Sequence, residues 1–533
     1  GSQVNDNVIL QTNGSTTTVS VDFAPVYSIN PKLRNNQILV VDAHLNTAGM
    51  TWLIGSQGSN GTVVINSTGT FSAGTNYWGN GNQTSLGSLT INDGGSFIGN
   101  GKQYGRQYTP WTINGTFTNT GVVESRGEIT ITGGSFASST TQLYNGNLTV
   151  TGGSVSGDIT FYGGVFAPDA ATDYSSQIKN STSAIKVDTN NQTINLTSAK
   201  LANSNTGGLT KEGTGTLNVS LYSNTYSGTT TINGGTLRLV NTSDLVGSSS
   251  SNFDINNGST LIVNSNVGGN NRTTFNNWKT FTFDSNGGGT ILYDKGNHLW
   301  QMSSSSFVTT GGSQNTITSA NGAFINPQNS NTINFNVADG TDDIDLVFSI
   351  TTGSGSILKT GNGKLSITAS STLGGGGSSG SITISDGTLD IGGSARYTTT
   401  GLAAGTVSTD ISNAGIFSYS SSAQQTITGV ISGSGSVVQD GSGTLILSGA
   451  NTYSGSTTIE SGTLKITIVD ALQNTSVVNV NGGSFLVGSS NSVNDAAAVN
   501  LNGGKIEFDG DVTEYIGALT LSSNSIIDMG GGD

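Results

Sequence analysis

The sequence contains no cysteine and is poor in charged residues, proline and histidine. Without cysteine, disulfides, thiolate metal ligands and thiol nucleophiles are all excluded. Charged residues make up 9% of the 533 residues, whereas ordinary globular proteins contain about 25%. Only 18 residues are Lys or Arg, against 32 Asp and Glu. The sequence therefore lacks the basic stripe that binds phosphate groups, and we expect no nucleic acid as a partner.

Long apolar runs are also missing. No stretch approaches the roughly 18 apolar residues of a membrane-spanning helix, so we expect no membrane insertion by this sequence. Histidine occurs only at His44 and His298, and neither lies in a recognisable catalytic motif. Residues that favour helices are scarce, while Ser, Thr, Asn and 79 glycines fill the polar positions. This composition suits strands and tight turns.

A chain rich in Gly and Ser can also be disordered, because it has little apolar surface to bury. Here, however, the apolar residues make up 33% of the chain. They alternate with polar residues in short runs such as "TTTINGGTLRL", Thr229 to Leu239. Flexible linkers do not show this period of two, so we expect folded strands.

A glycine precedes each strand-like run and recurs about every 20 residues. Within the regular stretches the spacing is 19 to 21 residues, with markers at Gly95, Gly115, Gly134, Gly153, Gly215, Gly235, Gly443, Gly462, Gly483 and Gly504. This period predicts an all-β fold, a right-handed parallel β-helix with three sheets, in which coils stack about 4.8 Å apart. Ordinary β-sandwiches are the alternative, but their strands recur every 8–12 residues or so.

The marker glycines are expected to supply the positive φ that the corners need. Asn114, Asn233 and Asn481 stand beside these corners, where stacked asparagines can hydrogen-bond along the axis. The period divides the chain into an N-terminal cap with first coils at 1–60, regular coils at 61–168, an irregular insertion or variant coils at 169–206, and a further β-helix at 207–533.

Two segments, 207–239 and 433–466, share a G-x-G-T-L, N-T-Y-x-G, G-T-L progression, and 353–391 is a degenerate third copy. They resemble the autotransporter-associated β-strand repeat. The resemblance implies a passenger domain of a type V secretion protein, which a bacterium exports through a C-terminal β-barrel to its surface or into the medium. No series of ten-residue amphipathic strands follows. We therefore expect the translocator barrel, which anchors such passengers in the outer membrane, to be absent from this sequence.

Two short motifs suggest chemistry only weakly. "QDGSGT", Gln439 to Thr444, echoes a serine-protease loop, but Gly441 and Gly443 are repeat glycines. The acidic run "DGTDDIDL" could offer calcium the oxygens of Asp339, Asp342 and Asp343. It lacks the spacing of known calcium loops, so a solvated turn is the better interpretation. We expect no metal and no cofactor.

The segment "GKQYGRQYTPW" differs most from its surroundings. It gathers Tyr104, Arg106, Tyr108 and Trp111, and Tyr77 and Trp78 lie about one coil earlier. Aromatic rings beside cations are typical of binding hot spots for sugars or proteins, which makes these residues the candidate binding site. The alternative is that these rings stack only to shield a face of a sheet.

Together these features predict a non-catalytic adhesin that serves virulence. Its expected partner is a host cell-surface protein or glycan, or another copy of itself. One alternative is a β-helical enzyme acting on glycans, which would need carboxylates that converge in a groove. The other is a vacuolating toxin, but the N-terminal "DNVILQTNGSTTTVSVDF" is short and polar for membrane insertion.

Overall fold

The chain folds into two compact units. Unit 1 comprises Gly1–Ser220 and Asn224–Leu237, and unit 2 comprises Leu221–Ser223 and Arg238–Asp533. The computed structural model describes residues 18–21, 32–33, 38–41, 44–47, 52–54, 61–73, 76–78, 87–105, 110–199, 201, 204–220, 226–240, 252–263, 272–275, 280–294, 299–302, 305–320, 324–327, 332–352, 355–373, 380–395, 397–399 and 405–530.

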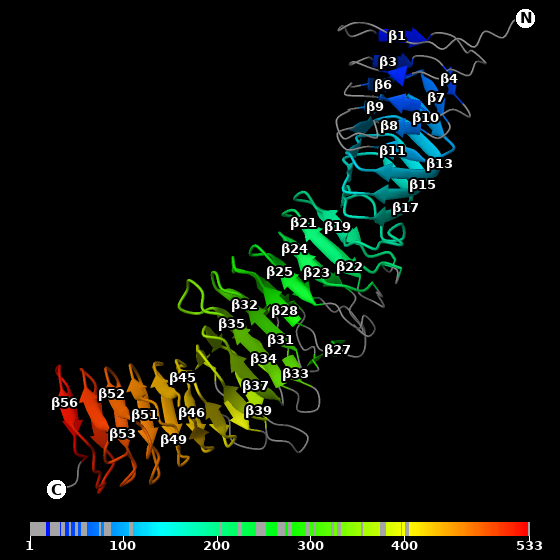
Figure 1. Ribbon diagram of the computed structural model, residues 1–533. Coiled ribbons are helices and arrows are strands. Elements are labelled where there is room, and N and C mark those ends of the chain that lie inside the picture. Colours follow the sequence, from blue (N-terminus) through cyan, green and yellow to red (C-terminus); the bar gives the residue numbers. More distant parts are fainter. Residues whose placement is uncertain are drawn as a thin grey trace, which may run out of the picture. The chain divides into compact units, whose positions relative to one another are not determined.

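Each unit is a parallel β-solenoid, as the sequence predicts. Coils of about 21 residues place short strands on one another in parallel rows (Figure 1). The described residues form strands, turns and bends but no helix. Accordingly, that part of the chain contains no helix long and apolar enough to cross a membrane.

The first row of unit 1 takes one strand from each coil. Its strands pair in parallel in the order β1 (Thr18–Val21), β3 (Ile38–Val41), β6 (Gly61–Ile65), β9 (Gly87–Ile91), β12 (Trp111–Ile113), β14 (Ile129–Ile131), β16 (Asn147–Val150), β18 (Val165–Ala167), β19 (Ile185–Asp188), β21 (Leu209–Glu212) and β23 (Thr230–Ile232). The segment 169–206 thus contributes β19 to the stack.

The second and third rows of unit 1 are joined by three long strands, β13 (Thr116–Ser125), β15 (Ser135–Leu143) and β17 (Ser154–Phe161). Their first halves continue the row β4 (His44–Thr47), β7 (Thr70–Ala73) and β10 (Ser96–Gly99). Their second halves continue the row β2 (Lys32–Leu33), β5 (Trp52–Ile54), β8 (Asn76–Trp78) and β11 (Gln103–Gly105). A register shift after Asn119 marks the bend in β13.

Later in unit 1, β20 (Thr193–Leu196) pairs in parallel with β22 (Thr216–Ser220). The division between the units falls within β24 (Thr236–Val240).

Unit 2 repeats the arrangement with three paths of strands. The first contains β25 (Phe253–Ile255), β28 (Thr280–Phe283), β31 (Ser306–Thr309), β34 (Thr332–Val337), β37 (Ser356–Thr360), β40 (Ile382–Ile384), β44 (Ile411–Asn413) and β47 (Ile431–Ser432). The second contains β26 (Thr260–Val263), β29 (Thr290–Tyr293), β32 (Asn315–Ser319), β35 (Leu346–Ser349), β38 (Lys364–Ile367), β41 (Thr388–Ile391), β45 (Ile416–Tyr419), β48 (Ser436–Gln439), β50 (Thr457–Ile459), β52 (Val477–Val480), β54 (Ala498–Leu501) and β56 (Leu519–Leu521).

The third path of unit 2 consists of three shorter sheets. These are β27 (Arg272–Phe275), β30 (Leu299–Met302), β33 (Phe324–Pro327) and β36 (Thr351–Thr352); β39 (Ser371–Leu373) and β42 (Tyr397–Thr399); and β43 (Thr406–Val407), β46 (Gln424–Ile427), β49 (Thr444–Leu447), β51 (Thr463–Ile466), β53 (Ser484–Val487), β55 (Lys505–Phe508) and β57 (Ile526–Asp528).

The core of each unit is built from columns of inward side chains. In unit 1, Phe71, Phe97, Phe117 and Phe136 are fully buried and stack ring on ring, with centroids 5.6, 4.7 and 4.7 Å apart. They stack because equivalent positions of neighbouring coils lie about 4.8 Å apart. Polar columns follow the same geometry at the corners. Asn502 Nδ2 donates to Asn481 Oδ1 at 2.8 Å, which confirms hydrogen bonding along the axis.

The marker glycines serve two different purposes. Gly134 has a φ of 62°, in the left-handed region, and so do Gly153, Gly235, Gly462 and Gly483. The expectation of a positive φ is wrong for the other five, Gly95, Gly115, Gly215, Gly443 and Gly504. There the neighbouring coil comes too close for any side chain. A Cβ at Gly115 would overlap the carbonyl oxygens of Asn92 and Gly95.

Candidate functional site

Trp111, one of the predicted binding residues, is part of the core. It lies in register between Leu89 of β9 and Ile129 of β14, and its side chain is completely buried. Trp111 and Ile113 point inward on either side of the exposed Thr112, as the strand's period of two requires. The prediction that Trp111 contacts a ligand is therefore wrong.

Tyr104 does lie at the surface of the third row. Its ring is half-buried, and the Lys102 Nζ lies 4.6 Å from the ring centroid. The backbone register sets Tyr104 of β11 beside Tyr77 of β8 on the preceding coil. The predicted residues that lie outside the described part are Arg106 and Tyr108, together with the side chains of Tyr77 and Trp78.

Glu124, at the end of β13, links two cations at this surface. Its Oε2 lies 2.8 Å from Lys102 Nζ, and its Oε1 lies 2.8 Å from Arg126 Nε. The Glu124 side chain is only 7% exposed, whereas those of Lys102 and Arg126 are 40% and 47% exposed. The carboxylate is thus covered by two cations that themselves reach the solvent.

The electrostatics of the three groups are coupled. Burial by itself would raise the pKa of Glu124, but the hydrogen bonds from Lys102 and Arg126 outweigh it and lower that pKa. The hydrogen bond to Glu124 raises the pKa of Lys102 against a smaller opposing effect of burial. Glu124 and Lys102 are therefore both charged at neutral pH.

Two tyrosines extend this surface along the solenoid. Tyr144 and Tyr162 stack face to face, with ring centroids 4.3 Å apart and planes 5° apart. The Arg126 guanidinium lies 5.0 Å from the centroid of Tyr144. The backbone fixes this column, because Tyr144 N donates to Ser125 O (2.7 Å) and Tyr162 N donates to Leu143 O (2.9 Å). Burial, with the neighbouring Tyr162, raises the pKa of Tyr144.

These side chains form the candidate binding surface, which we call the Glu124 face. It consists of Lys102, Tyr104, Glu124, Arg126, Tyr144 and Tyr162. Four successive coils supply them, so the sequence alone shows only the first part of the face as a cluster.

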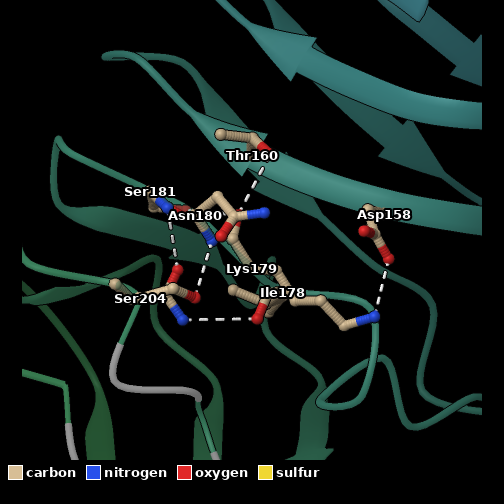
Figure 2. Close-up of polar contacts among 8 residues, drawn as sticks. Asp158, Thr160, Ile178, Lys179, Asn180, Ser181 and Ser204 are labelled. Carbon is tan, nitrogen blue, oxygen red and sulfur yellow. Dashed lines mark hydrogen bonds and ion pairs between the residues drawn. The ribbon is translucent and has the colours of Figure 1, made fainter.

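The next coil adds another ion pair to the same row, and Figure 2 shows how it is held. Lys179 Nζ lies 2.8 Å from Asp158 Oδ1. The Thr160 hydroxyl donates to the backbone oxygen of Lys179 at 3.0 Å. Asn180, with a φ of 55°, turns the chain and donates its N–H to the Ser204 hydroxyl at 3.0 Å. Lys179 is 44% exposed and so continues the run of surface cations.

The acidic run at 339–346 makes hydrogen-bonded turns. Asp342 Oδ2 accepts the Gln314 N–H at 2.7 Å, and Asp345 Oδ1 accepts the Gly340 N–H at 2.7 Å. Within the described ranges, no group of three or more His, Cys, Asp or Glu could hold a metal ion. The side chain of His44, and all of His298, lie outside those ranges.

The repeats also contain a buried lysine that was not predicted from the sequence. Lys211 points inward, and its Nζ donates to the carbonyl oxygens of Glu212, Gly213 and Gly234 at 2.8, 2.6 and 2.9 Å. Burial lowers the pKa of Lys211 to about 8, although Asp188 and Glu212 oppose the shift.

The other two repeat copies place a donor at the equivalent position. In the second copy, buried Lys359 donates to the carbonyl oxygens of Thr360 (3.0 Å), Gly361 (2.6 Å) and Asp386 (3.2 Å). In the third, the Gln439 amide donates to Gly441 O at 2.8 Å and Gly443 O at 3.1 Å. The sequence signal is a Lys or Gln two residues before G-x-G. It also explains "QDGSGT" as a structural corner.

Comparison with known families agrees with the repeats. The family model described as Passenger-associated-transport-repeat matches residues 209–239 and 437–466. These lie within two of the three copies predicted from the sequence, and 353–391 lies outside the match. None of the curated proteins matches the chain. The fold and the matched repeats support a secreted protein, found at the cell surface or outside the cell. More narrowly, the chain carries the repeats of an autotransporter passenger domain.

Proposed function

We propose that this passenger is a non-catalytic bacterial adhesin that binds a host cell-surface protein or glycan through the Glu124 face. The observation that carries the proposal is a cation beside a tyrosine ring at two places on the same row, Lys102 at Tyr104 and Arg126 at Tyr144. Tyrosine and arginine supply much of the binding energy at protein interfaces, and rings beside cations also suit sugars. Anchoring in the outer membrane and a role in virulence belong to the same proposal.

The rigidity of the face supports binding. Glu124 holds Lys102 and Arg126 at 2.8 Å, so both cations are already positioned before a ligand arrives. Less side-chain entropy is then lost on binding. The stacked coils repeat similar surfaces, which favours many weak contacts over one deep pocket. The same repetition would serve contacts with another copy of the chain.

The contacts of the acidic residues support the absence of catalysis. Asp173 Oδ2 accepts the N–H groups of Thr197 and Ser198 at 2.7 and 2.8 Å. The buried Asp390 Oδ1 accepts the Ser418 hydroxyl at 2.8 Å. A glycosidase needs two carboxylates that face each other across a substrate groove. Asp173 and Asp390 are instead engaged in holding neighbouring coils together.

Adhesion of protein-coated beads to cultured host cells tests the proposal. We expect the double variant Arg126→Ala/Tyr144→Ala to lose most of the adhesion, because it removes the cation and its ring. A matched control is Lys465→Ala/Tyr515→Ala in unit 2, where Lys465 is paired with Asp509 and Tyr515 is exposed. Equal adhesion by both double variants, or cleavage of a polysaccharide by the wild type, would contradict the proposal.

A further inference from the structure

The acidic residues of the chain are unevenly distributed between the units, while the basic residues are not. Unit 1 contains nine Lys and Arg against eleven Asp and Glu, a formal charge of −2. Unit 2 contains nine against twenty-one, a formal charge of −12. Charges further apart than about 8–10 Å are largely screened at physiological salt. The electrostatic energy of an anion bound at the surface of unit 1 therefore depends on the nearby charges of unit 1.

Three cations of unit 1 that reach the solvent lie on one row. Lys102 and Arg126 lie on neighbouring coils of the third row, and Lys179 lies three coils further on. Each of the three is at least 40% exposed. Lys102 and Arg126 share a single, nearly buried carboxylate, so this pair carries a net charge of +1 toward the solvent. Positioned ammonium and guanidinium groups are strong donors to carboxylate and sulfate oxygens.

The same row also presents groups that suit sugar rings. Tyr104, Glu124, Gln142 and Thr160 are partners in register along β11, β13, β15 and β17. Next to this column, Arg126 is followed by the stacked pair Tyr144 and Tyr162. Side chains in these columns recur about every 4.8 Å. A long polymer with repeated charged and hydroxyl groups could contact several coils at once.

Resting on the proposed adhesin function, we infer that the Glu124 face binds an acidic polysaccharide, with Lys102 and Arg126 contacting its carboxylate or sulfate groups. Tyr104, Tyr144 and Gln142 contact its sugar rings and hydroxyls. A neutral glycan would leave the net charge of +1 on Lys102, Arg126 and Glu124 without a counter-charge. A polyphosphate such as DNA offers charge but not the same array of ring hydroxyls.

Binding of three polymers to the immobilised full chain tests this inference. Polygalacturonate carries only carboxylates, dextran sulfate only sulfates, and dextran neither. We expect one or both acidic polymers to bind and dextran not to bind. Binding should weaken steeply as sodium chloride is raised, because ion pairs at a surface are screened. The two acidic arms identify which anion the face prefers.

Single variants then locate the site. We expect Lys102→Gln and Arg126→Gln each to weaken binding about tenfold, which corresponds to one charged hydrogen bond. Each leaves Glu124 one cationic partner, so the fold should persist, as circular dichroism can verify. The matched control is Arg238→Gln, which removes an ion-paired arginine of unit 2 and should leave binding unchanged.

The possible results separate this inference from the proposed function. If neither acidic polymer binds while the beads still adhere to cells, the acidic ligand is wrong and the adhesin proposal stands. If beads coated with the wild-type chain do not adhere to cells, the adhesin proposal itself is wrong. Equal binding of dextran, equal binding of duplex DNA, or an equal effect of Arg238→Gln would each overturn the inference.

Discussion

At the scale of single residues, hydrogen bonds between coils hold the repeats together from inside. Lys211, Lys359 and Gln439 reach the same kind of corner and satisfy carbonyl oxygens that would otherwise be buried without a donor. An ammonium and an amide both serve as donors here. They differ in charge, and a buried charge costs free energy.

That difference predicts a pH-dependent stability. Burial lowers the pKa of Lys359 from 10.5 to about 8, so between these values the unfolded chain binds more protons than the folded one. Stability should then rise as the pH rises from about 8 to 10.5 and be insensitive to this group below 8. Lys359→Gln should be more stable than the wild type at pH 7 by about 1–2 kcal/mol. Urea unfolding should show the gap closing as the pH approaches 10.5.

The reverse substitution provides the control. Gln439→Lys should be less stable than the wild type at pH 7 and should recover as the pH rises. A gap between Lys359→Gln and the wild type that stays constant from pH 7 to 10.5 would contradict the explanation by buried charge.

The close approach of two coils at Gly115 predicts that adding a methyl group there costs more stability than adding one at Gly105. Gly115→Ala would push a Cβ into the carbonyl oxygens of Asn92 and Gly95, and we expect it to lower the free energy of unfolding by about 2–4 kcal/mol. At Gly105 the nearest atoms to an added Cβ are ring carbons of Trp111, at 3.7 Å. Gly105→Ala should therefore change stability by less than about 1 kcal/mol. An equal change in melting temperature for the two variants would contradict this explanation of the marker glycines.

At the scale of strands, alternation decides which side chains stack and which face water. In β13, Phe117 is buried and Thr118 is exposed. Phe117 lies between Phe97 and Phe136, with centroids 4.7 Å away on both sides. Phe117 thus depends on both neighbouring coils for its stacked ring contacts.

Removing one ring should therefore loosen several coils. We expect Phe117→Ala to cost about 3–5 kcal/mol, because it leaves a cavity between two rings. Thr118→Ala, one position along the strand, should cost less than about 0.5 kcal/mol. Hydrogen exchange should show faster opening of β10, β13 and β15 in Phe117→Ala only. An effect confined to β13 would contradict cooperative stacking of the coils.

Alternation also explains what the sequence could and could not predict. The 20-residue period predicts the parallel solenoid, because each coil must repeat the inward positions of the last. The same rule applied to Trp111 and Ile113 would have assigned Trp111 to the core, beside Leu89 and Ile129. The Glu124 face depends on the bend after Asn119, where the register shifts. Counting alternate residues along the sequence does not locate that register shift. The ion pairs of Glu124 with Lys102 and Arg126 could therefore not be predicted from the sequence.

At the scale of the whole molecule, the uneven charge predicts different responses of the two units to salt. Unit 2, with a formal charge of −12, should be destabilised by its own repulsion at low ionic strength. Raising sodium chloride from about 0.02 to about 0.5 M shortens the screening length from above 20 Å to below 5 Å. We expect hydrogen exchange in unit 2 to slow by a factor that corresponds to roughly 1 kcal/mol, while exchange in unit 1 changes little.

Sucrose provides the matched control, because it stabilises folded chains through exclusion from their surface and not through charge. At equal osmolality it should slow exchange in both units alike. A solenoid opens locally and stepwise, so peptides from each unit report their own stability within one experiment. If salt protects both units equally, the uneven charge has no influence on stability, and hydration or ion binding common to all coils must account for the effect.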